Sequence, residues 1–92
     1  MELLTEDEIA GRLGALPGWT RQGSSIVTTV TRGDFREAML FTGAVAYLAE
    51  QANHHPDIAI AWNKVTLTLS SHSDGGLTAA DFDLAGKISA LG

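Results

Sequence analysis

The sequence contains no cysteine, few basic residues and no long apolar run, and each absence excludes a class of protein. Without cysteine, the chain has no disulfide, no thiolate metal site and no thiol nucleophile. Six Lys and Arg against eleven Asp and Glu give a formal charge of −5, which argues against a general nucleic-acid surface. The apolar runs are too short to span a bilayer, and Glu2 directly after Met1 is unlike the basic start of a signal peptide. We therefore expect a cytoplasmic protein with no nucleic-acid or membrane partner.

The balance of residue types that are present is that of a folded protein. Hydrophobic residues make up 45% of the chain and charged residues 18%, a composition that favours a packed core over disorder. The length of 92 residues predicts one domain, residues 1–92. A chain of this size buries a small core, so association with further copies would help to stabilise it.

Three segments have the spacing of apolar residues and the capping signals of helices. Residues 5–16 begin with Thr5 and Glu8, the pattern of a capping box, and end before Pro17. Residues 34–53 form the longest candidate, with Asp34 and Glu37 in the same relation at its start. The third candidate begins at Thr78 and extends to residue 91.

The apolar surface of the 34–53 segment is wider than one packed face requires. A first set shares one face at helical spacing: Phe35, Ala38, Met39, Thr42, Val45, Ala46, Ala49 and Ala52. A second set widens it: Phe41, Ala44 and Leu48. Because a helix apolar over more than half its circumference usually contacts two surfaces, we expect the second surface to be another subunit.

Four segments rich in β-branched residues read as strands in two hairpins. Residues 19–22 and 25–31 flank a turn at Gly23, and residues 57–61 and 64–71 flank a turn at Trp62 and Asn63. The order α-β-β-α-β-β-α predicts an α+β two-layer sandwich, a four-stranded antiparallel sheet with helices packed on one face.

All three histidines lie within residues 50–72, which suggests an acid/base site. Glu50 and His54 are four residues apart on the predicted helix, so we expect their side chains to be neighbours. His55 follows at the helix end, and His72 ends the last strand. If that strand end lies beside the helix end, the three imidazoles converge, and histidine can give or take protons near neutral pH.

Each of these residues also fits an ordinary structural role, and the residues alone leave both possibilities open. A lone histidine is most often a solvated surface residue, Asp81 stands where a capping box with Thr78 would place it, and Trp62 fits ordinary packing. A metal site is disfavoured because adjacent His54 and His55 rarely bind one ion and no H-x₃-H or H-E-x-x-H spacing is present. Neither a G-x-S-x-G nucleophile elbow nor a phosphate-binding P-loop is found.

The spacing of these residues nevertheless resembles that of one family. Glu50-x-x-x-His54-His55-Pro56, followed by Trp62, His72 and Asp81, is similar to the pattern of the pterin-4a-carbinolamine dehydratases. The stretches "LPGW", "NKVTLTLSSH" and "GGLTAADFDLA" resemble the family as well, so the likeness covers nearly the whole chain. The resemblance implies the same α-β-β-α-β-β-α sandwich and a dimer or tetramer, which agrees with the wide apolar surface of residues 34–53.

The resemblance implies loss of water from a 4a-hydroxytetrahydropterin to give a quinonoid dihydropterin, without metal or cofactor. It assigns His54 and His72 as the acid/base pair, with Glu50 and Asp81 orienting or polarising histidines. His55 is expected to bind and orient the pterin, and the expected substrate-binding set is Asn53, His55, Pro56, Ser71 and Trp62.

Two departures and two alternative functions accompany the resemblance. Many members carry aspartate at the position of Asn53 and an aromatic residue at that of Ile58, so pterin contacts can differ here. Animal members also act as dimerisation cofactors for a transcription factor, which makes a protein-partner role the alternative to catalysis. A third possibility is that the substrate is a different pterin, since no residue selects the pterin side chain.

Overall fold

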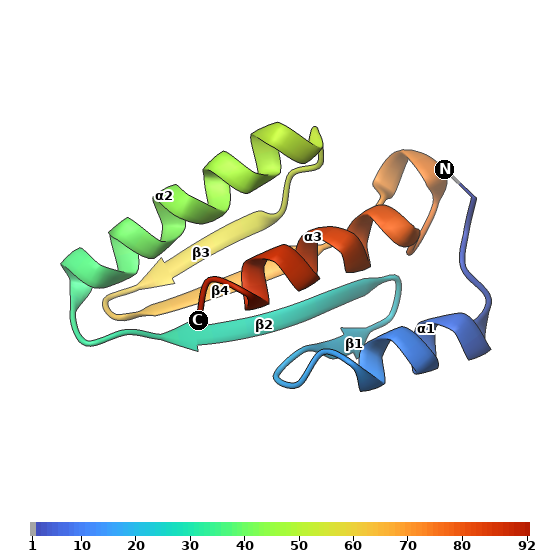
Figure 1. Ribbon diagram of the computed structural model, residues 1–92, viewed down its shortest axis with the longest axis horizontal. Helices are drawn as coiled ribbons and strands as arrows, with labels where there is room; N and C mark the ends of the chain where they lie inside the picture. The colour runs from blue at the N-terminus through green and yellow to red at the C-terminus, as the bar shows by residue number, and fades with distance from the viewer. Residues whose placement is uncertain (1) are drawn as a thin grey trace.

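The computed structural model describes residues 2–92 and confirms the order α-β-β-α-β-β-α (Figure 1). The elements are α1 (Glu6–Gly14), β1 (Thr20–Gln22), β2 (Ser25–Thr31), α2 (Phe35–Ala52), β3 (Asp57–Ala61), β4 (Lys64–Leu69), a short 3₁₀ helix η1 (His72–Asp74) and α3 (Ala79–Ser89). At most of the helix and strand ends, the predicted and the observed bounds differ by one or two residues, and at the others they agree. The 3₁₀ helix was not predicted from the sequence.

The four strands form one antiparallel sheet in the order β1-β2-β4-β3. The two predicted hairpins pair with each other through β2 and β4, with Ile26 opposite Leu69 and Val30 opposite Val65. Helices α2 and α3 lie across one face of this sheet, and α1 lies beside β1 (Figure 1). The predicted α+β sandwich is therefore confirmed.

Strict alternation in β4 sets which face of the sheet is buried. Val65, Leu67 and Leu69 are fully buried against the helices, while Thr66 and Thr68 point to the other side. The core cluster of buried apolar residues also draws on α2 and α3, and its largest fully buried members include Ile26, Val45 and Leu84.

The capping signals read from the sequence form at all three helix starts, with one change. Thr5 with Glu8 makes the expected capping box on α1. At α2, the Asp34 side chain accepts from the Glu37 backbone N–H at 2.8 Å, as expected. The Glu37 carboxylate, however, accepts from the N–H of Gly33 and not of Asp34, so the reciprocal half of that box is shifted by one residue.

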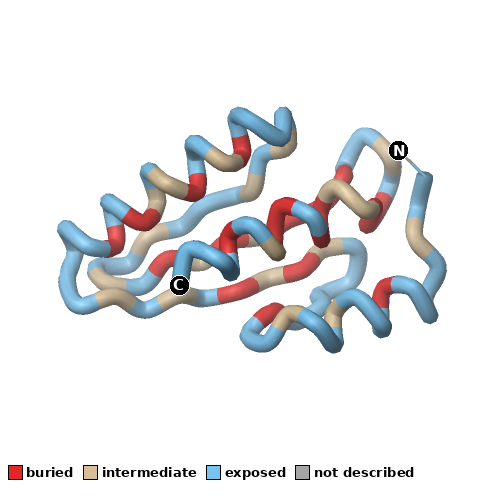
Figure 2. Tube along the Cα trace, in the orientation of Figure 1, coloured by how far each residue is buried: buried red, intermediate tan, exposed pale blue. Residues whose placement is uncertain are grey.

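The two apolar sides of α2 are divided differently from the sequence prediction. Phe41, assigned to the second surface, is buried, and Arg32 stacks on its ring. Phe35 and Met39, predicted to share one helical face with Ala38 and Val45, are about half exposed, whereas Ala38 and Val45 are buried. We use the term outer face of α2 for its exposed large apolar residues: Phe35, Met39, Leu40 and Tyr47. Figure 2 shows the buried positions of α2 recurring along the side that faces the sheet, with exposed positions between them.

One end of the molecule collects the segments that carry the predicted site. There α2 ends, β3 begins, β4 ends and α3 begins (Figure 1). The pairing of Asp57 with Thr68 keeps the start of β3 beside the end of β4. The histidines near residue 54 and the histidine at 72 are therefore brought to the same end of the sheet, the condition for the three imidazoles to converge.

Candidate active site

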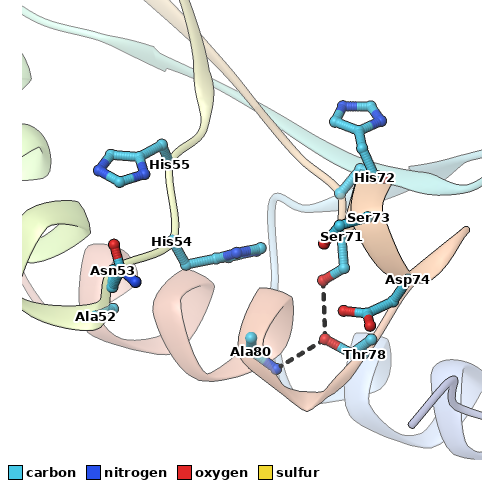
Figure 3. Close-up of a pocket in the computed structure, with 11 residues that line it drawn as sticks. Ala52, Asn53, His54, His55, Ser71, His72, Ser73, Asp74, Thr78 and Ala80 are labelled. Atoms are coloured by element: carbon cyan, nitrogen blue, oxygen red, sulfur yellow. Dashed lines mark hydrogen bonds between the residues drawn. The ribbon is translucent and has the colours of Figure 1, made fainter. Parts of the chain in front are cut away.

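A pocket of about 470 Å³ lies at this end of the sheet (Figure 3). Two stretches of chain provide most of its wall: residues 52–55 after α2 and residues 70–74 after β4. Thr78 and Ala80, at the start of α3, complete it. Of the residues expected in the site, the pocket is lined by Asn53, His54, His55, Ser71 and His72.

The end of α2 determines how the histidine pair is presented. Asn53 adopts the left-handed conformation (φ 49°, ψ 44°), which asparagine tolerates better than most residues. Its backbone N–H donates to the Glu50 carbonyl, and the N–H of His54 donates to the Ala49 carbonyl, the two bonds of a Schellman motif. His54 therefore leaves the helical register and turns into the pocket (Figure 3).

His54 is paired with Asp81 and not with Glu50. Its Nε2 lies 2.5 Å from Asp81 Oδ1, and the Asp81 side chain is completely buried. The expected i, i+4 contact between Glu50 and His54 is wrong, because the left-handed residue 53 takes His54 off the face of α2 that carries Glu50. Asp81 comes from α3, 27 residues further along the chain.

Asp81 both caps α3 and holds His54. Its Oδ2 accepts from the Thr78 backbone N–H at 2.9 Å, completing the capping box that the sequence predicted. The same oxygen accepts from the Ser71 hydroxyl at 2.8 Å, and Oδ1 faces His54. The capping role and the histidine-orienting role of Asp81 therefore coexist, one for each carboxylate oxygen.

Glu50 instead contacts the second histidine of the pair. Its Oε2 lies 2.5 Å from His55 Nε2, and both side chains are more than half exposed. Because water screens an exposed ion pair, this contact orients the His55 ring without adding much to stability. His55 is thus held at the open rim of the pocket, whereas His54 is held inside it.

His72 faces the pocket from the wall opposite His54 and His55. It begins η1, directly after Ser71, and its side chain makes no hydrogen bond to any of residues 2–92. Figure 3 shows the two histidines on the α2–β3 connection at one side and His72 on the other, with the pocket between them. A small molecule in the pocket would meet imidazoles from two sides.

The structure places two of the expected substrate-binding residues outside the pocket lining. Pro56 directly follows His55, where its ring keeps His55 out of the helical conformation, and leads into β3. Trp62 lies in the β3–β4 turn and is 64% exposed. The five residues of β3, at about 3.3 Å each, separate it from the pocket. The structure therefore does not bring Trp62 to this pocket within one chain.

Several lining residues were not predicted from the sequence. Ser70, Ser73, Asp74 and Thr78 all contribute to the pocket. Thr78 had been recognised only as a helix cap. The unbroken polar run from Ser70 to Asp74, directly after a strand with one buried face, was the available signal.

The described residues contain neither a metal-binding cluster nor a membrane-spanning helix. Within residues 2–92, no three side chains of the metal-binding types His, Asp and Glu are grouped closely enough to hold an ion. No helix in that part of the chain is both long and apolar enough to cross a membrane.

Comparison with known protein families gives one answer over nearly the whole chain. The family model for pterin 4 alpha carbinolamine dehydratase matches residues 2–91. A Roseiflexus castenholzii protein provisionally named pterin-4-alpha-carbinolamine dehydratase is 57% identical over 86 residues, which cover 94% of this chain and 92% of the relative. A Nocardia farcinica protein with the same provisional name is 51% identical over 98% of this chain and 95% of its own.

Two solved structures share the fold. The crystal structure of a transcriptional coactivator/pterin dehydratase from Brucella melitensis is 36% identical, covers 98% of both chains and superposes with a TM-score of 0.93. A pterin dehydratase-like protein identified as a RuBisCO assembly factor in the alpha-carboxysome is 26% identical. It covers 80% of this chain and 88% of its own, with a TM-score of 0.69.

Proposed function

Because the chain belongs to the pterin 4 alpha carbinolamine dehydratase family, we propose that it removes water from a 4a-hydroxytetrahydropterin. The product is a quinonoid dihydropterin, which a reductase can return to the tetrahydro state, so the reaction supports recycling of tetrahydrobiopterin. The observation that carries the proposal is the pocket with His54 and His72 on opposite walls.

The reaction needs one proton delivered and one removed. An acid protonates the hydroxyl on C4a, the C4a–O bond breaks and water leaves. A base takes the proton from N5, and the electron pair left on N5 forms the double bond to C4a. Two imidazoles, one protonated and one neutral, can supply both steps near neutral pH. His54 lies inside the pocket and His72 on its opposite wall, so we assign the acid and the base to this pair.

The other expected site residues orient a histidine or contact the pterin. Glu50 holds the His55 ring at the rim, where it can bind and orient the pterin. Asp81 orients His54 from beneath the pocket. Asn53 lines the pocket with a neutral amide that can hydrogen-bond the pterin, and its left-handed backbone also turns His54 inward.

The test is dehydration of freshly generated 4a-hydroxytetrahydropterin, followed by absorbance in the presence of a chelator. His54→Ala and His72→Ala should each lose about 10²–10⁴-fold of the enzymatic rate, the usual contribution of one positioned proton transfer. The rate of the uncatalysed reaction is the lowest rate that this assay can give. His55→Ala is the comparison variant and should raise KM more than it lowers kcat. A wild-type protein that gives only the spontaneous rate would refute the dehydratase proposal.

Self-association is a second proposal, and the outer face of α2 is the observation that favours it. Leu40 and Tyr47 are more than 60% exposed on this helix. Gly43 lies three residues after Leu40 and four before Tyr47, on the same exposed side of the helix, and its lack of a side chain leaves room for close approach of another helix. We propose that a second copy of the chain covers this face, giving a homodimer or homotetramer.

The oligomeric state in solution tests this second proposal. Leu40→Asp should reduce the mass measured by light scattering during gel filtration, because it places a charge in the apolar contact. Trp62→Asn is the matched control: Trp62 is equally exposed at 64%, lies in the β3–β4 turn, and has a positive φ that asparagine tolerates. A monomeric wild-type protein, or equal effects of the two variants, would refute an assembly through the outer face of α2.

A further inference from the structure

We propose that Ser71 is a positioning residue which, through Asp81, fixes His54 so that Nδ1, and not Nε2, exchanges protons with the bound molecule. The sequence had suggested Ser71 as a substrate ligand. The kinetic part of this inference rests on the proposed dehydratase function, whereas the tautomer of His54 can be measured without any substrate.

The Ser71 hydroxyl is committed to the protein. Ser71 is only 4% exposed, and its Oγ lies 2.8 Å from both Asp81 Oδ2 and Thr78 Oγ1. An ionised carboxylate only accepts hydrogen bonds, so the single hydroxyl hydrogen of Ser71 goes to Asp81. The Thr78 hydroxyl must then donate to Ser71, while Thr78 Oγ1 accepts from the Ala80 backbone N–H at 3.3 Å. In this buried series of hydrogen bonds, the Thr78 hydroxyl donates to Ser71 and the Ser71 hydroxyl donates to the Asp81 carboxylate.

These hydrogen bonds hold the Asp81 carboxylate in one orientation. Its Oδ2 is occupied by the Ser71 hydroxyl and the Thr78 N–H, and its Oδ1 is the oxygen left for His54. Two donors on one oxygen prevent the carboxylate from rotating without breaking a buried hydrogen bond. Since Asp81 Oδ1 accepts, His54 Nε2 must carry a proton toward it.

The remaining ring nitrogen of His54 is the one open to the pocket. No buried side-chain nitrogen or oxygen in residues 2–92 lacks a hydrogen-bond partner. His54 Nδ1 makes no hydrogen bond with these residues, so it must keep some accessible surface, and we assign that surface to the pocket because His54 lines it. Nδ1 is therefore an acceptor when the ring is neutral and a donor when it is protonated. In both states Nε2 keeps its proton and donates it in a hydrogen bond to Asp81 Oδ1.

A role for Ser71 acting through Asp81 predicts a kinetic signature different from that of a substrate ligand. Removing the hydroxyl leaves Asp81 Oδ2 with one donor, so the carboxylate and the His54 ring gain freedom. Ser71→Ala should lower kcat by about 10-fold, the low end of the effect of removing a group that orients a functional histidine. KM should stay within about 2-fold, because no pterin contact is lost. Ser71→Thr keeps the hydroxyl and should restore most of kcat.

Thr28→Val is the matched control. Thr28 is 8% exposed, its hydroxyl donates to the Gly18 carbonyl at 2.8 Å, and it is not among the residues that line the pocket. The variant therefore loses a buried hydroxyl without disturbing Asp81 or His54, and its kcat should match that of the wild type. A higher KM with unchanged kcat in Ser71→Ala would instead identify Ser71 as a substrate ligand and overturn the proposal.

The tautomer of His54 is measured on the ligand-free protein by ¹⁵N NMR of the imidazoles, with His54→Ala used to assign the signals. In the neutral ring, wild-type His54 should show the pattern of protonated Nε2 and unprotonated Nδ1. A protonated Nδ1 in the neutral ring would overturn the proposal, even if Ser71→Ala fails to fold. A protein with the expected tautomer but no dehydration activity would refute the proposed function alone.

Discussion

Replacing Asp81 by asparagine should inactivate the protein while leaving it folded. The amide has the shape of the carboxylate but only one acceptor oxygen. The Thr78 N–H and the Ser71 hydroxyl both require an acceptor, so the amide oxygen takes the place of Oδ2. The amide NH₂ then faces His54 Nε2, where it can only donate. Nε2 becomes the acceptor, and the proton of the neutral ring moves to Nδ1, the nitrogen that faces the pocket.

The expected size of the effect follows from which contacts are lost. If His54 is the base, a neutral ring with a protonated Nδ1 cannot accept the substrate proton; if His54 is the acid, the amide NH₂ facing Nε2–H disfavours the protonated ring. In either role kcat should fall by about 10²–10⁴-fold. The helix cap remains, but the three hydrogen bonds that the Asp81 carboxylate accepts, from His54, Ser71 and Thr78, are no longer charge-assisted, which costs roughly 2–4 kcal/mol of unfolding free energy. Small proteins have about 5–15 kcal/mol, so Asp81→Asn should stay folded at 25 °C.

The assay combines the absorbance measurement of carbinolamine dehydration with urea unfolding followed by circular dichroism. Asp83→Asn is the control, because Asp83 lies two residues further along α3 and its side chain is 65% exposed, 3.8 Å from Arg12. It should change neither kcat nor stability by a measurable amount. If Asp81→Asn is folded and its kcat is within 2-fold of the wild type, the assignment of Nδ1 as the working nitrogen is refuted.

Three further outcomes follow from the structure. Glu50→Gln should raise KM by about 2- to 5-fold, and less at high salt, because its exposed contact to His55 is screened by ions; an unchanged KM would show that Glu50 does not orient His55 for binding. Trp62→Asn should leave KM within 2-fold if one chain forms the whole site, and a larger rise would mean that a neighbouring chain places Trp62 beside the pterin. The hydrogen bond from Arg21 holds the pKa of Glu6 below its ordinary value of 4.5, so the unfolded state takes up this proton first as the pH falls. The stability from this contact should therefore be complete above about pH 4.5 and lost below it, and Glu6→Gln should flatten that part of the curve of urea midpoint against pH.

Local rules were sufficient for most of the fold. Thr5 and Thr78 cap helices because a hydroxyl beside free backbone N–H groups satisfies them wherever the rest of the chain lies. The alternation of Val65 and Leu67 with Thr66 predicts a strand with one buried face for a similarly local reason. The order of such elements then leaves few ways to bury their apolar faces, and the sandwich is one of them.

The exposure of α2 could not be obtained from the sequence. Phe35, Met39 and Phe41 are all apolar, and the helical period puts them on a surface too broad to divide. Only the position of the sheet and of α3 determines that Phe41 is buried and that Phe35 and Met39 are not.

For the site, the amino-acid sequence predicted part of the polar set, the three histidines, Glu50 and Asp81, from the spacing of one family, but not the polar wall of Ser70, Ser73, Asp74 and Thr78. Their partners depend on the folded arrangement. Glu50 and His54 were expected to pair because a helix brings side chains four residues apart together. The helix ends before His54, however, because Asn53 adopts the left-handed conformation. The pairing of His54 with Asp81 joins residues 27 apart, through the packing of α3 beside the end of α2. Contacts of that kind depend on how whole elements pack, which no local pattern records.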